Sequence, residues 1–290
     1  MRYEGTVYRP PSEANSVLIQ CTIGCPHNRC TFCPMYKGTQ FRIRPLNEIM
    51  EDLQSASIYY GDTAETMFFP DGNTILMKTE QLIAILEEAK RLFPRLERIT
   101  VYGSARYINL KTAEELVRLK AAGLSRIHSG MESGDDVVLA RIQKGATAAE
   151  IIEAGLKVKQ AGIELSEYIL IGAGGQDRSQ EHAAGSAAVL NSIVPNFIRV
   201  RTLIPIPGTP LYEDFSQGRF GLLTPHAALQ ETRLLVEALE CQSLFYSDHY
   251  SNYAYVNGAL PGDKPAMLKA IDKLLTIPED QFRPPAEGSL

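Results

Sequence analysis

The chain has 290 residues, of which 44% are hydrophobic and 22% are charged. This balance is typical of a globular protein with a full core and excludes a largely disordered chain. The formal net charge of −5 disfavours a polyanion as the main partner, because phosphate binding needs a basic face. The sequence has no run of 18 apolar residues and no charged-then-apolar leader, so we expect a cytoplasmic protein without a membrane partner.

The five cysteines are unevenly distributed. Four lie between residues 21 and 33, and Cys241 stands alone far downstream. A disulfide framework would spread its cysteines to join distant segments, and it belongs to small secreted chains. Clustered cysteines in a chain of this size indicate metal or redox chemistry instead.

Short β-branched runs alternate with longer amphipathic stretches along most of the chain. Strands are expected over residues 16–20, 66–69, 98–102, from 125–128 onward, 164–171 and 197–203. Helices are expected over residues 47–57, 79–93, 112–122, 135–142, 148–161 and 180–191. Such alternation predicts an α/β fold with parallel strands joined by right-handed crossovers. An open doubly wound sheet and a curved partial barrel both fit, but no Gly-x-Gly-x-x-Gly follows the first strand, so a dinucleotide-binding domain has no support.

The regular alternation of strand and helix patterns stops after the proline-rich loop at residues 205–210. Two further helices, over residues 225–239 and 263–275, flank the polar and aromatic stretch FYSDHYSNYAYVNG. We interpret residues 1–212 as the core domain. Residues 213–290 then form a helical and irregular extension that covers one end of the sheet.

The chemistry is concentrated in the segment CPHNRCTFC. Cys25, Cys30 and Cys33 follow the first strand, with four and then two residues between them. Thiolates bind iron well, and three of them leave one iron of a 4Fe-4S cluster open to a ligand. Cys21 could join this set, but it ends the strand, and we interpret it as a buried core thiol. Structural zinc on four cysteines is the alternative, although it usually needs two pairs separated by a longer loop.

This segment resembles the signature of the radical S-adenosylmethionine superfamily. That signature has three cysteines after the first strand of a partial (β/α)6 barrel, with an aromatic residue, here Phe32, between the last two. The resemblance covers roughly residues 16–212 and is strongest to the branch of tRNA methylthiotransferases and oxygen-independent coproporphyrinogen oxidases. It implies a 4Fe-4S cluster that reductively cleaves S-adenosylmethionine to a 5′-deoxyadenosyl radical. The first gap is four residues where three is usual, so the cluster loop is one residue larger.

The resemblance also implies cofactor contacts at strand ends, where an α/β sheet places its ligand site. In FFPDGNT, Asp71 and Gly72 stand where the family has a glycine-rich segment that meets the methionine amine. In MESG, Glu132 resembles the glutamate that bonds the ribose hydroxyls. Ser133 beside it either contacts the cofactor or caps the following helix.

Further cofactor contacts are expected from residues that follow other strands and helices of the sheet. Lys144 either meets the cofactor carboxylate or acts as a charge at a helix C-terminus. The segment YILIGAGGQ is similar to the one that packs on adenine in the family. The remaining expected contacts after strands are Ser104, Arg106, Ile171 and Gly172.

Substrate contacts are expected from the sixth strand and the tail. An arginine among strand residues needs a carboxylate partner or a wet cavity, which makes Arg201 a candidate. In the tail, His249, Asn252 and Tyr253 suit a substrate lid, although each singly also suits a structural role.

Together these features predict an oxygen-sensitive radical enzyme, an oxidoreductase in the broad sense, with reduced flavodoxin or ferredoxin as its electron donor. A small-molecule substrate is favoured over nucleic acid, because no basic RNA-binding domain is visible. Modification of tRNA is the first alternative. The second is a non-catalytic iron–sulfur or zinc carrier, although an electron carrier needs four cysteines to close its cluster.

Overall fold

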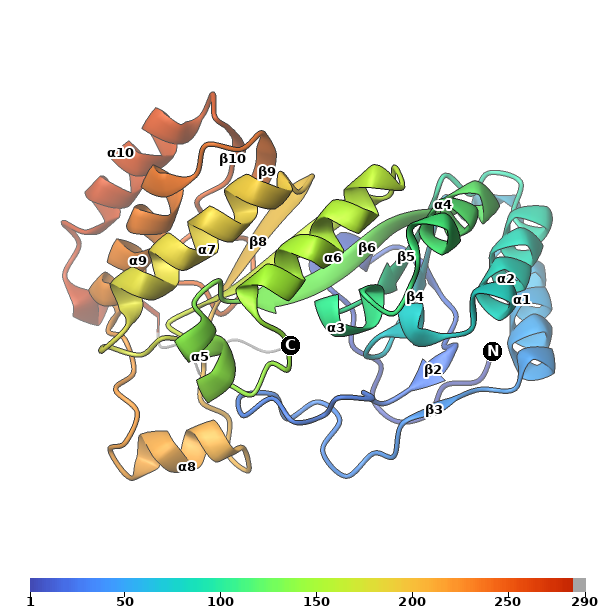
Figure 1. Cartoon of the computed structure of the whole chain (residues 1–290), viewed down its shortest axis with the longest axis horizontal. Coiled ribbons are helices and arrows are strands. Elements are labelled where there is room, and N and C mark those ends of the chain that lie inside the picture. The colour runs from blue at the N-terminus through green and yellow to red at the C-terminus, as the bar shows by residue number, and fades with distance from the viewer. Residues whose placement is uncertain (284–290) are drawn as a thin grey trace. The chain divides into compact units, whose positions relative to one another are not determined.

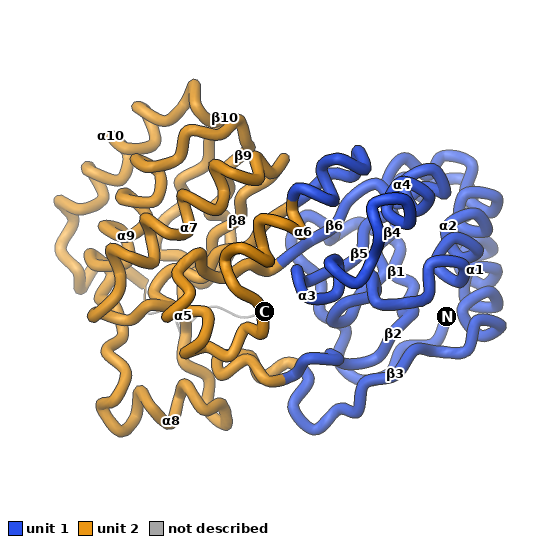
Figure 2. The backbone as a smooth tube through the Cα atoms, in the orientation of Figure 1, with its two compact units in different colours: residues 1–28, 36–129, 156–165 blue, residues 29–35, 130–155, 166–290 orange. Residues whose placement is uncertain are grey.

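The computed structural model describes residues 1–283 of the chain. These residues divide into two compact units, each built of strands and helices (Figure 2). Unit 1 consists of Met1–Asn28, Tyr36–Ser129 and Leu156–Leu165. Unit 2 consists of Arg29–Met35, Gly130–Gly155 and the residues from Ser166 on.

Unit 1 is built on four parallel strands in the order β1-β4-β5-β6, of which Figure 1 labels β4, β5 and β6. Its strands and helices are β1 (Val17–Leu18), β4 (Thr66–Phe69), β5 (Arg98–Tyr102), α1 (Leu46–Tyr60), α2 (Thr79–Leu92), α3 (Ala105–Ile108) and α4 (Ala113–Ala122). A short antiparallel pair joins β2 (Thr22–Ile23) to β3 (Arg42–Ile43). Strands β6 (Leu124–Glu132) and β7 (Glu164–Ile171) and helix α6 (Ala148–Gln160) have residues in both units.

Helix α2 shows why these segments fold as they do. Leu82, Ile85, Leu86 and Ala89 follow helical spacing and are all fully buried. Glu80 lies in the first turn, where the helix dipole favours negative charge, and the last turn is basic. Helix α2 packs between α1 and α4. The apolar stripe therefore both directs the helix into the core of unit 1 and sets its neighbours.

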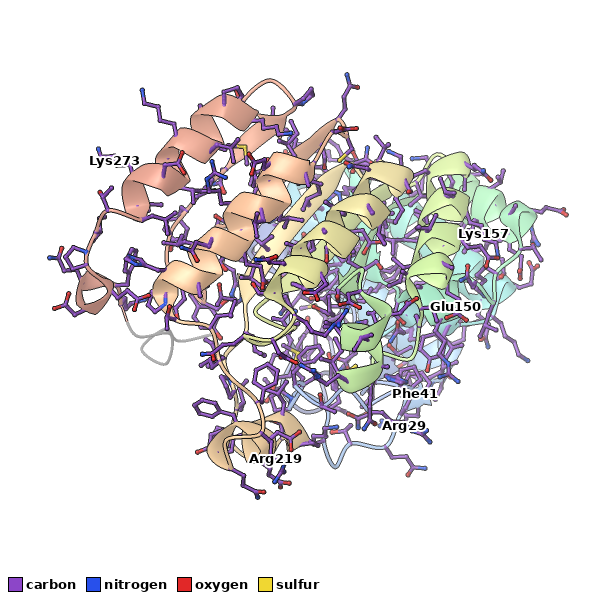
Figure 3. All side chains as sticks on the ribbon, turned by 60° about the vertical axis from the view of Figure 1, so that its left-hand side comes forward. Arg29, Phe41, Glu150, Lys157, Arg219 and Lys273 are labelled. Carbon is purple, nitrogen blue, oxygen red and sulfur yellow. The ribbon has the colours of Figure 1, made fainter. Side chains whose placement is uncertain are left out.

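Unit 2 has strands in the order β7-β8-β9-β10, in which the β9–β10 pair is antiparallel. Its further elements are α5 (Asp136–Arg141), α7 (Ser179–Ile193), β8 (Phe197–Thr202), α8 (Pro210–Ser216), α9 (Pro225–Ala238), β9 (Ser243–Tyr246), β10 (Gly258–Leu260) and α10 (Lys264–Leu274). Helix α9 packs against both α7 and α10 (Figure 1). Exposed charged side chains such as Arg219 and Lys273 point away from the ribbon (Figure 3).

The expected order of strands and helices is confirmed, with boundaries that differ by a few residues at most. The strands at 66–69, 98–102 and 164–171 are found as predicted, while the first strand is reduced to Val17–Leu18. The tail is less irregular than expected, because β9 extends the sheet of unit 2 beside β8. The predicted domain boundary at residue 212 stays a prediction.

Within residues 1–283, none of the helices combines the length and the apolar character that crossing a membrane requires.

Candidate active site

The thiol of Cys25 lies in a loop of unit 1 that is rich in N–H donors. Its Sγ accepts a hydrogen bond from the Asn28 amide at 3.5 Å and from Asn73 Nδ2 at 3.7 Å. Thiol sulfur is a weak hydrogen-bond acceptor, and these two donors fix its position within the loop. Asn73 also accepts from the Ser104 amide at 2.6 Å, which joins this loop to the start of α3.

Gly72 packs directly against Cys25. A Cβ atom at Gly72 would lie 2.8 Å from Cys25 Cβ and 3.1 Å from its Sγ, so only glycine fits without a shift. The Gly72 amide donates to the Gly24 carbonyl at 3.1 Å. Gly72 therefore shapes the surroundings of the first predicted cluster ligand, and its predicted contact with the cofactor stays a prediction.

Asp71 holds the same loop together. Its Oδ2 accepts from Gln20 Nε2 and from the Gly24 amide, both at 3.0 Å, and its Oδ1 accepts from the Tyr36 hydroxyl at 3.4 Å. Burial raises the pKa of the Asp71 carboxyl, against these three hydrogen bonds. Both oxygens have partners within the protein, which supports a structural role, and the predicted contact with an ammonium group stays a prediction.

The segment with Cys30 and Cys33 is anchored in unit 2. The Thr31 amide donates to the Ile142 carbonyl, and the Thr31 carbonyl accepts from the Leu211 amide, both at 3.0 Å. Phe32 packs against an apolar cluster formed by Val138, Ile142, Leu170, Ala173, Leu203, Leu211 and Phe220. The aromatic residue of the motif therefore works here as a hydrophobic anchor for the segment.

Exposure separates the cysteines into two classes. Cys25, Cys30 and Cys33 are partly exposed and form no disulfide. Cys21 is fully buried, and burial raises the pKa of its thiol far above the ordinary value, as expected for a core residue. Three reduced, accessible thiols suit an iron–sulfur cluster chemically. Across residues 1–283, no group of three cysteine, histidine or acidic side chains is placed to hold a metal ion, so the ligand assignment stays a prediction.

Glu132 is the centre of a charged cluster in unit 2. Its Oε1 lies 3.3 Å from Lys144 Nζ, and its Oε2 lies 3.8 Å from Arg201 Nη2. Among the described residues, Oε2 has no hydrogen-bond donor although it is buried. The Glu132 backbone is left-handed, with φ of 64°, and its carboxylate folds back over Gly130. A strained, buried carboxylate with two cations nearby is typical of a binding site.

Ile171 and Gly172 lie at the end of β7. Ile171 is buried, and its carbonyl accepts from the Leu203 amide at 2.8 Å. Gly172 has φ of 84°, and its amide donates to Glu231 Oε1 at 2.6 Å. Glu231 was not identified from the sequence. The available signal was a carboxylate on the buried face of an amphipathic helix.

Three other predicted residues have different settings. Ser133 is fully buried, and its hydroxyl lies 2.8 Å from His182 Nδ1. Helix α5 is capped by Asp135 and not by Ser133. Ser104 precedes α3 without a side-chain cap, and Arg106 in that helix is exposed.

The substrate candidates lie in unit 2. Arg201 lies over the Tyr168 ring, with its guanidinium carbon 5.6 Å from the ring centre. Burial and the charge of Arg201 lower the pKa of His249 to about 4. Asn252 bonds the carbonyls of Val200 and Ser247 and the Thr202 hydroxyl, and Tyr253 packs edge-on against Phe282. These contacts support a structural role for Asn252, and the predicted contacts with substrate stay predictions.

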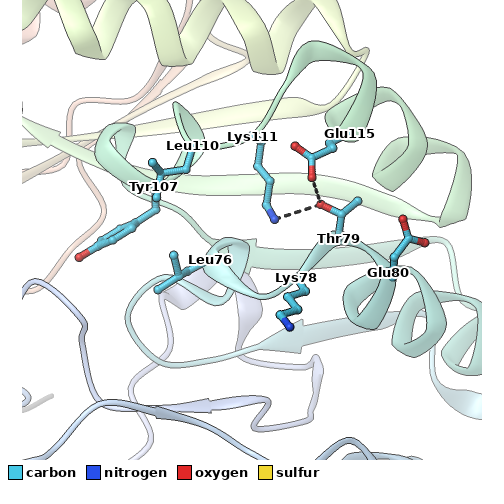
Figure 4. A pocket seen from close by; sticks show the side chains of 8 residues that line it. All are labelled: Leu76, Lys78, Thr79, Glu80, Tyr107, Leu110, Lys111 and Glu115. Carbon is cyan, nitrogen blue, oxygen red and sulfur yellow. Dashed lines mark hydrogen bonds between the residues drawn. The ribbon is translucent and has the colours of Figure 1, made fainter.

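A separate hollow of about 420 Å³ lies in unit 1 at the starts of α2 and α4 (Figure 4). Lys111 Nζ donates there to Thr79 Oγ1 at 3.1 Å, and Thr79 donates to Glu115 at 2.6 Å. None of the predicted site residues lines this hollow. Its buried polar groups bond one another and join the two helices.

Comparison with known proteins gives matches to one family. The family model described as the radical SAM superfamily matches residues 19–185. A biotin synthase of Anaeromyxobacter sp. (strain Fw109-5) is 27% identical over 190 residues, which cover 64% of this chain and 49% of that protein. The heme chaperone HemW of Bacillus subtilis (strain 168) is 22% identical over 237 residues, which cover 79% of this chain and 61% of that protein. The chain thus spans about half the length of the first of these relatives.

Solved structures give the same fold at low sequence identity. Coproporphyrinogen III oxidase of Escherichia coli has a TM-score of 0.56 at 16% identity, covering 77% of this chain and 52% of that one. Methylornithine synthase has a TM-score of 0.54 at 16% identity, covering 88% of this chain and 68% of that one. The expected partial-barrel α/β fold is therefore confirmed.

Proposed function

Since the chain belongs to the radical SAM superfamily, whose members use a 4Fe-4S cluster and S-adenosylmethionine, we propose that Cys25, Cys30 and Cys33 hold that cluster here. When bound, the reduced cluster supplies the electron that cleaves S-adenosylmethionine and yields a 5′-deoxyadenosyl radical. The observation that carries this proposal is the setting of Cys25, whose Sγ receives two N–H donors and faces the bare backbone of Gly72.

Two segments of unit 2 are proposed to bind S-adenosylmethionine. Glu132 accepts hydrogen bonds from the ribose hydroxyls. Its buried Oε2 accepts no hydrogen bond from the described residues, which leaves it available for this contact. Lys144 and Arg201 both lie beside Glu132, so this cluster carries a net positive charge that favours the cofactor carboxylate. Ile171 and Gly172 contribute apolar surface and close backbone approach for adenine.

We further propose hydrogen abstraction from a small organic substrate, with Arg201 and His249 as its contacts. A reduced flavodoxin or ferredoxin supplies the electron, and the protein works in the cytoplasm. The net charge of −5 supports a small substrate over tRNA, which remains the second option because of the branch resemblance. The non-catalytic carrier is the third, and it would need a fourth cysteine ligand.

The deciding experiment is anaerobic reconstitution followed by a count of iron and sulfide. Dithionite and S-adenosylmethionine are then added, and 5′-deoxyadenosine is measured. About four irons per chain together with deoxyadenosine formation is the expected result. Bound zinc, or a cluster that is indifferent to S-adenosylmethionine, would contradict the proposal and favour the carrier.

A further inference from the structure

A buried carboxylate on α9 lies behind the loop that follows β7. Glu231 Oε1 accepts from the Gly172 amide at 2.6 Å, and its Oε2 accepts from Ser179 Oγ at 2.5 Å. Glu231 is fully buried. A carboxylate away from water needs such donors, because its desolvation is costly. The hydrogen bonds to Gly172 and Ser179 therefore explain why a carboxylate lies on the apolar face of α9.

A buried histidine lies between this carboxylate and Ser133. His182 on α7 has Nε2 3.4 Å from Glu231 Oε1 and Nδ1 2.8 Å from Ser133 Oγ. Ser133 Oγ accepts from the Asp135 amide at 3.0 Å, so its hydroxyl proton is available to His182 Nδ1. Among the described residues, His182 Nε2 has no hydrogen-bond partner, so the approach of His182 to Glu231 is a packing contact. Burial lowers the pKa of His182 to about 4, which keeps the ring neutral near pH 7.

This arrangement of a serine, a histidine and a carboxylate does not make Ser133 a nucleophile. In hydrolases the serine must reach a substrate and the carboxylate orients the histidine. Here Ser133, His182 and Glu231 are all fully buried, so none of them meets a substrate. Burial also raises the pKa of Glu231 to about 7, against the hydrogen bonds from Ser179 and Gly172. The chain of contacts is suited to holding backbone in place.

We propose that Glu231 is a positioning residue for S-adenosylmethionine. It fixes the Gly172 loop, because it accepts hydrogen bonds from the Gly172 amide and from Ser179. The loop proposed to contact adenine is thereby held in place by a helix of the tail. This inference rests on the proposed function, because that loop is a cofactor contact only if the chain binds S-adenosylmethionine.

The test compares two substitutions at Glu231 in the reconstituted protein. Glu231→Asp keeps a carboxyl group but shortens the side chain by one methylene, so we expect it to lose the hydrogen bond from the Gly172 amide. We expect the dissociation constant for S-adenosylmethionine, from titration of the electron paramagnetic resonance signal, to rise about tenfold, which is ~1.4 kcal/mol. Hydrogen exchange at the Gly172 amide should become faster, while the iron content stays the same. Glu231→Gln keeps an acceptor for Gly172, so its affinity should stay within about threefold of wild type.

Thr232→Val is the matched control, because within residues 1–283 the hydroxyl of this neighbour on α9 bonds only the Ala228 carbonyl of its own helix, at 2.9 Å. It should leave the affinity unchanged. If Glu231→Asp does not fold, Ser179→Ala decides, because it removes the donor to the other oxygen of Glu231, with an expected loss of affinity of about threefold. Wild-type affinity in the folded Glu231→Asp protein, or failing that in Ser179→Ala, overturns this inference alone. A wild-type protein that does not bind S-adenosylmethionine overturns the proposed function and this inference together.

Discussion

A thiol binds iron only where it can lose its proton, and burial divides the five cysteines accordingly. Cys21 and Cys241 are buried, and desolvation raises the pKa of both thiols. The three cysteines of the motif are partly exposed, and one of them receives two N–H donors. Exposure therefore selects the same trio that the sequence spacing selects.

Substitution of single cysteines tests that selection. Cys30→Ala should lower the iron content after reconstitution and abolish 5′-deoxyadenosine formation, because the cluster loses a ligand. Cys241→Ala is the control and should retain both. Cys21→Ala should also retain iron. Turnover by the Cys30→Ala protein, or loss of the cluster from Cys21→Ala, would show that the ligand assignment is wrong.

Gly72 offers a second test at this scale. In Gly72→Ala the new methyl group would lie 2.8 Å from Cys25 Cβ, so the loop must shift. We expect a loss of about 1–3 kcal/mol in the free energy of unfolding, as for other overpacked sites. The iron content should fall as well. Gly262→Ala is the control, since its methyl group would meet only the Ala259 carbonyl at 3.7 Å. Equal iron content in the two variants would argue against a role of Gly72 in shaping the cluster loop.

At the scale of elements, the sequence predicts what depends on local periodicity. The stripe Leu82, Ile85 and Leu86 predicts α2 because spacing alone puts these residues on one face. Strands β9 and β10 were missed because the stretch around them is polar and aromatic without a period of two. The contact of Glu231 with Gly172 was missed for another reason. It joins residues 59 positions apart, and no local pattern encodes such pairing.

The N-terminal segment is tied to β5 and β6 by one buried carboxylate. Glu13 lies 3.0 Å from His128 Nε2 and 3.2 Å from Arg98 Nη2, and it accepts from Ser16 Oγ at 2.6 Å. Burial raises the pKa of the Glu13 carboxyl, but the bonds and charges of these partners outweigh it and hold the pKa below its ordinary value of 4.5.

A carboxyl group whose pKa is lower in the folded state than in the unfolded state stabilises the protein at any pH above the unfolded-state pKa. That stabilisation is lost as the pH falls through the folded-state pKa. Glu13→Gln should therefore cost about 1–3 kcal/mol at pH 7, and the difference from wild type should shrink below pH 4.5. Urea unfolding at pH 7, 5.5 and 4 measures this. Glu4→Gln, which affects an exposed pair with Arg42, should change little. A difference that grows toward pH 4 would contradict the lowered pKa.

At the scale of the whole molecule, the net charge favours one of the two proposed substrate classes over the other. The chain carries 29 basic and 34 acidic residues, so at neutral pH it repels a polyanion unless a local basic face outweighs the total. Proteins that bind RNA through its backbone show affinity that falls steeply with salt, because bound counterions are released. An enzyme that acts on a small molecule is not expected to show this salt dependence of RNA binding.

Binding of labelled total tRNA, followed by fluorescence anisotropy across a series of salt concentrations, separates the two classes. For a small-molecule enzyme we expect no saturable binding tighter than about 100 μM at physiological salt, which is the weak end of non-specific binding. Deoxyadenosine formation should likewise be unchanged by added tRNA. Free nucleotides at the same phosphate concentration serve as the control. Micromolar binding with a steep salt dependence would mean that a basic face overrides the net charge of −5, and tRNA would then become the leading substrate class.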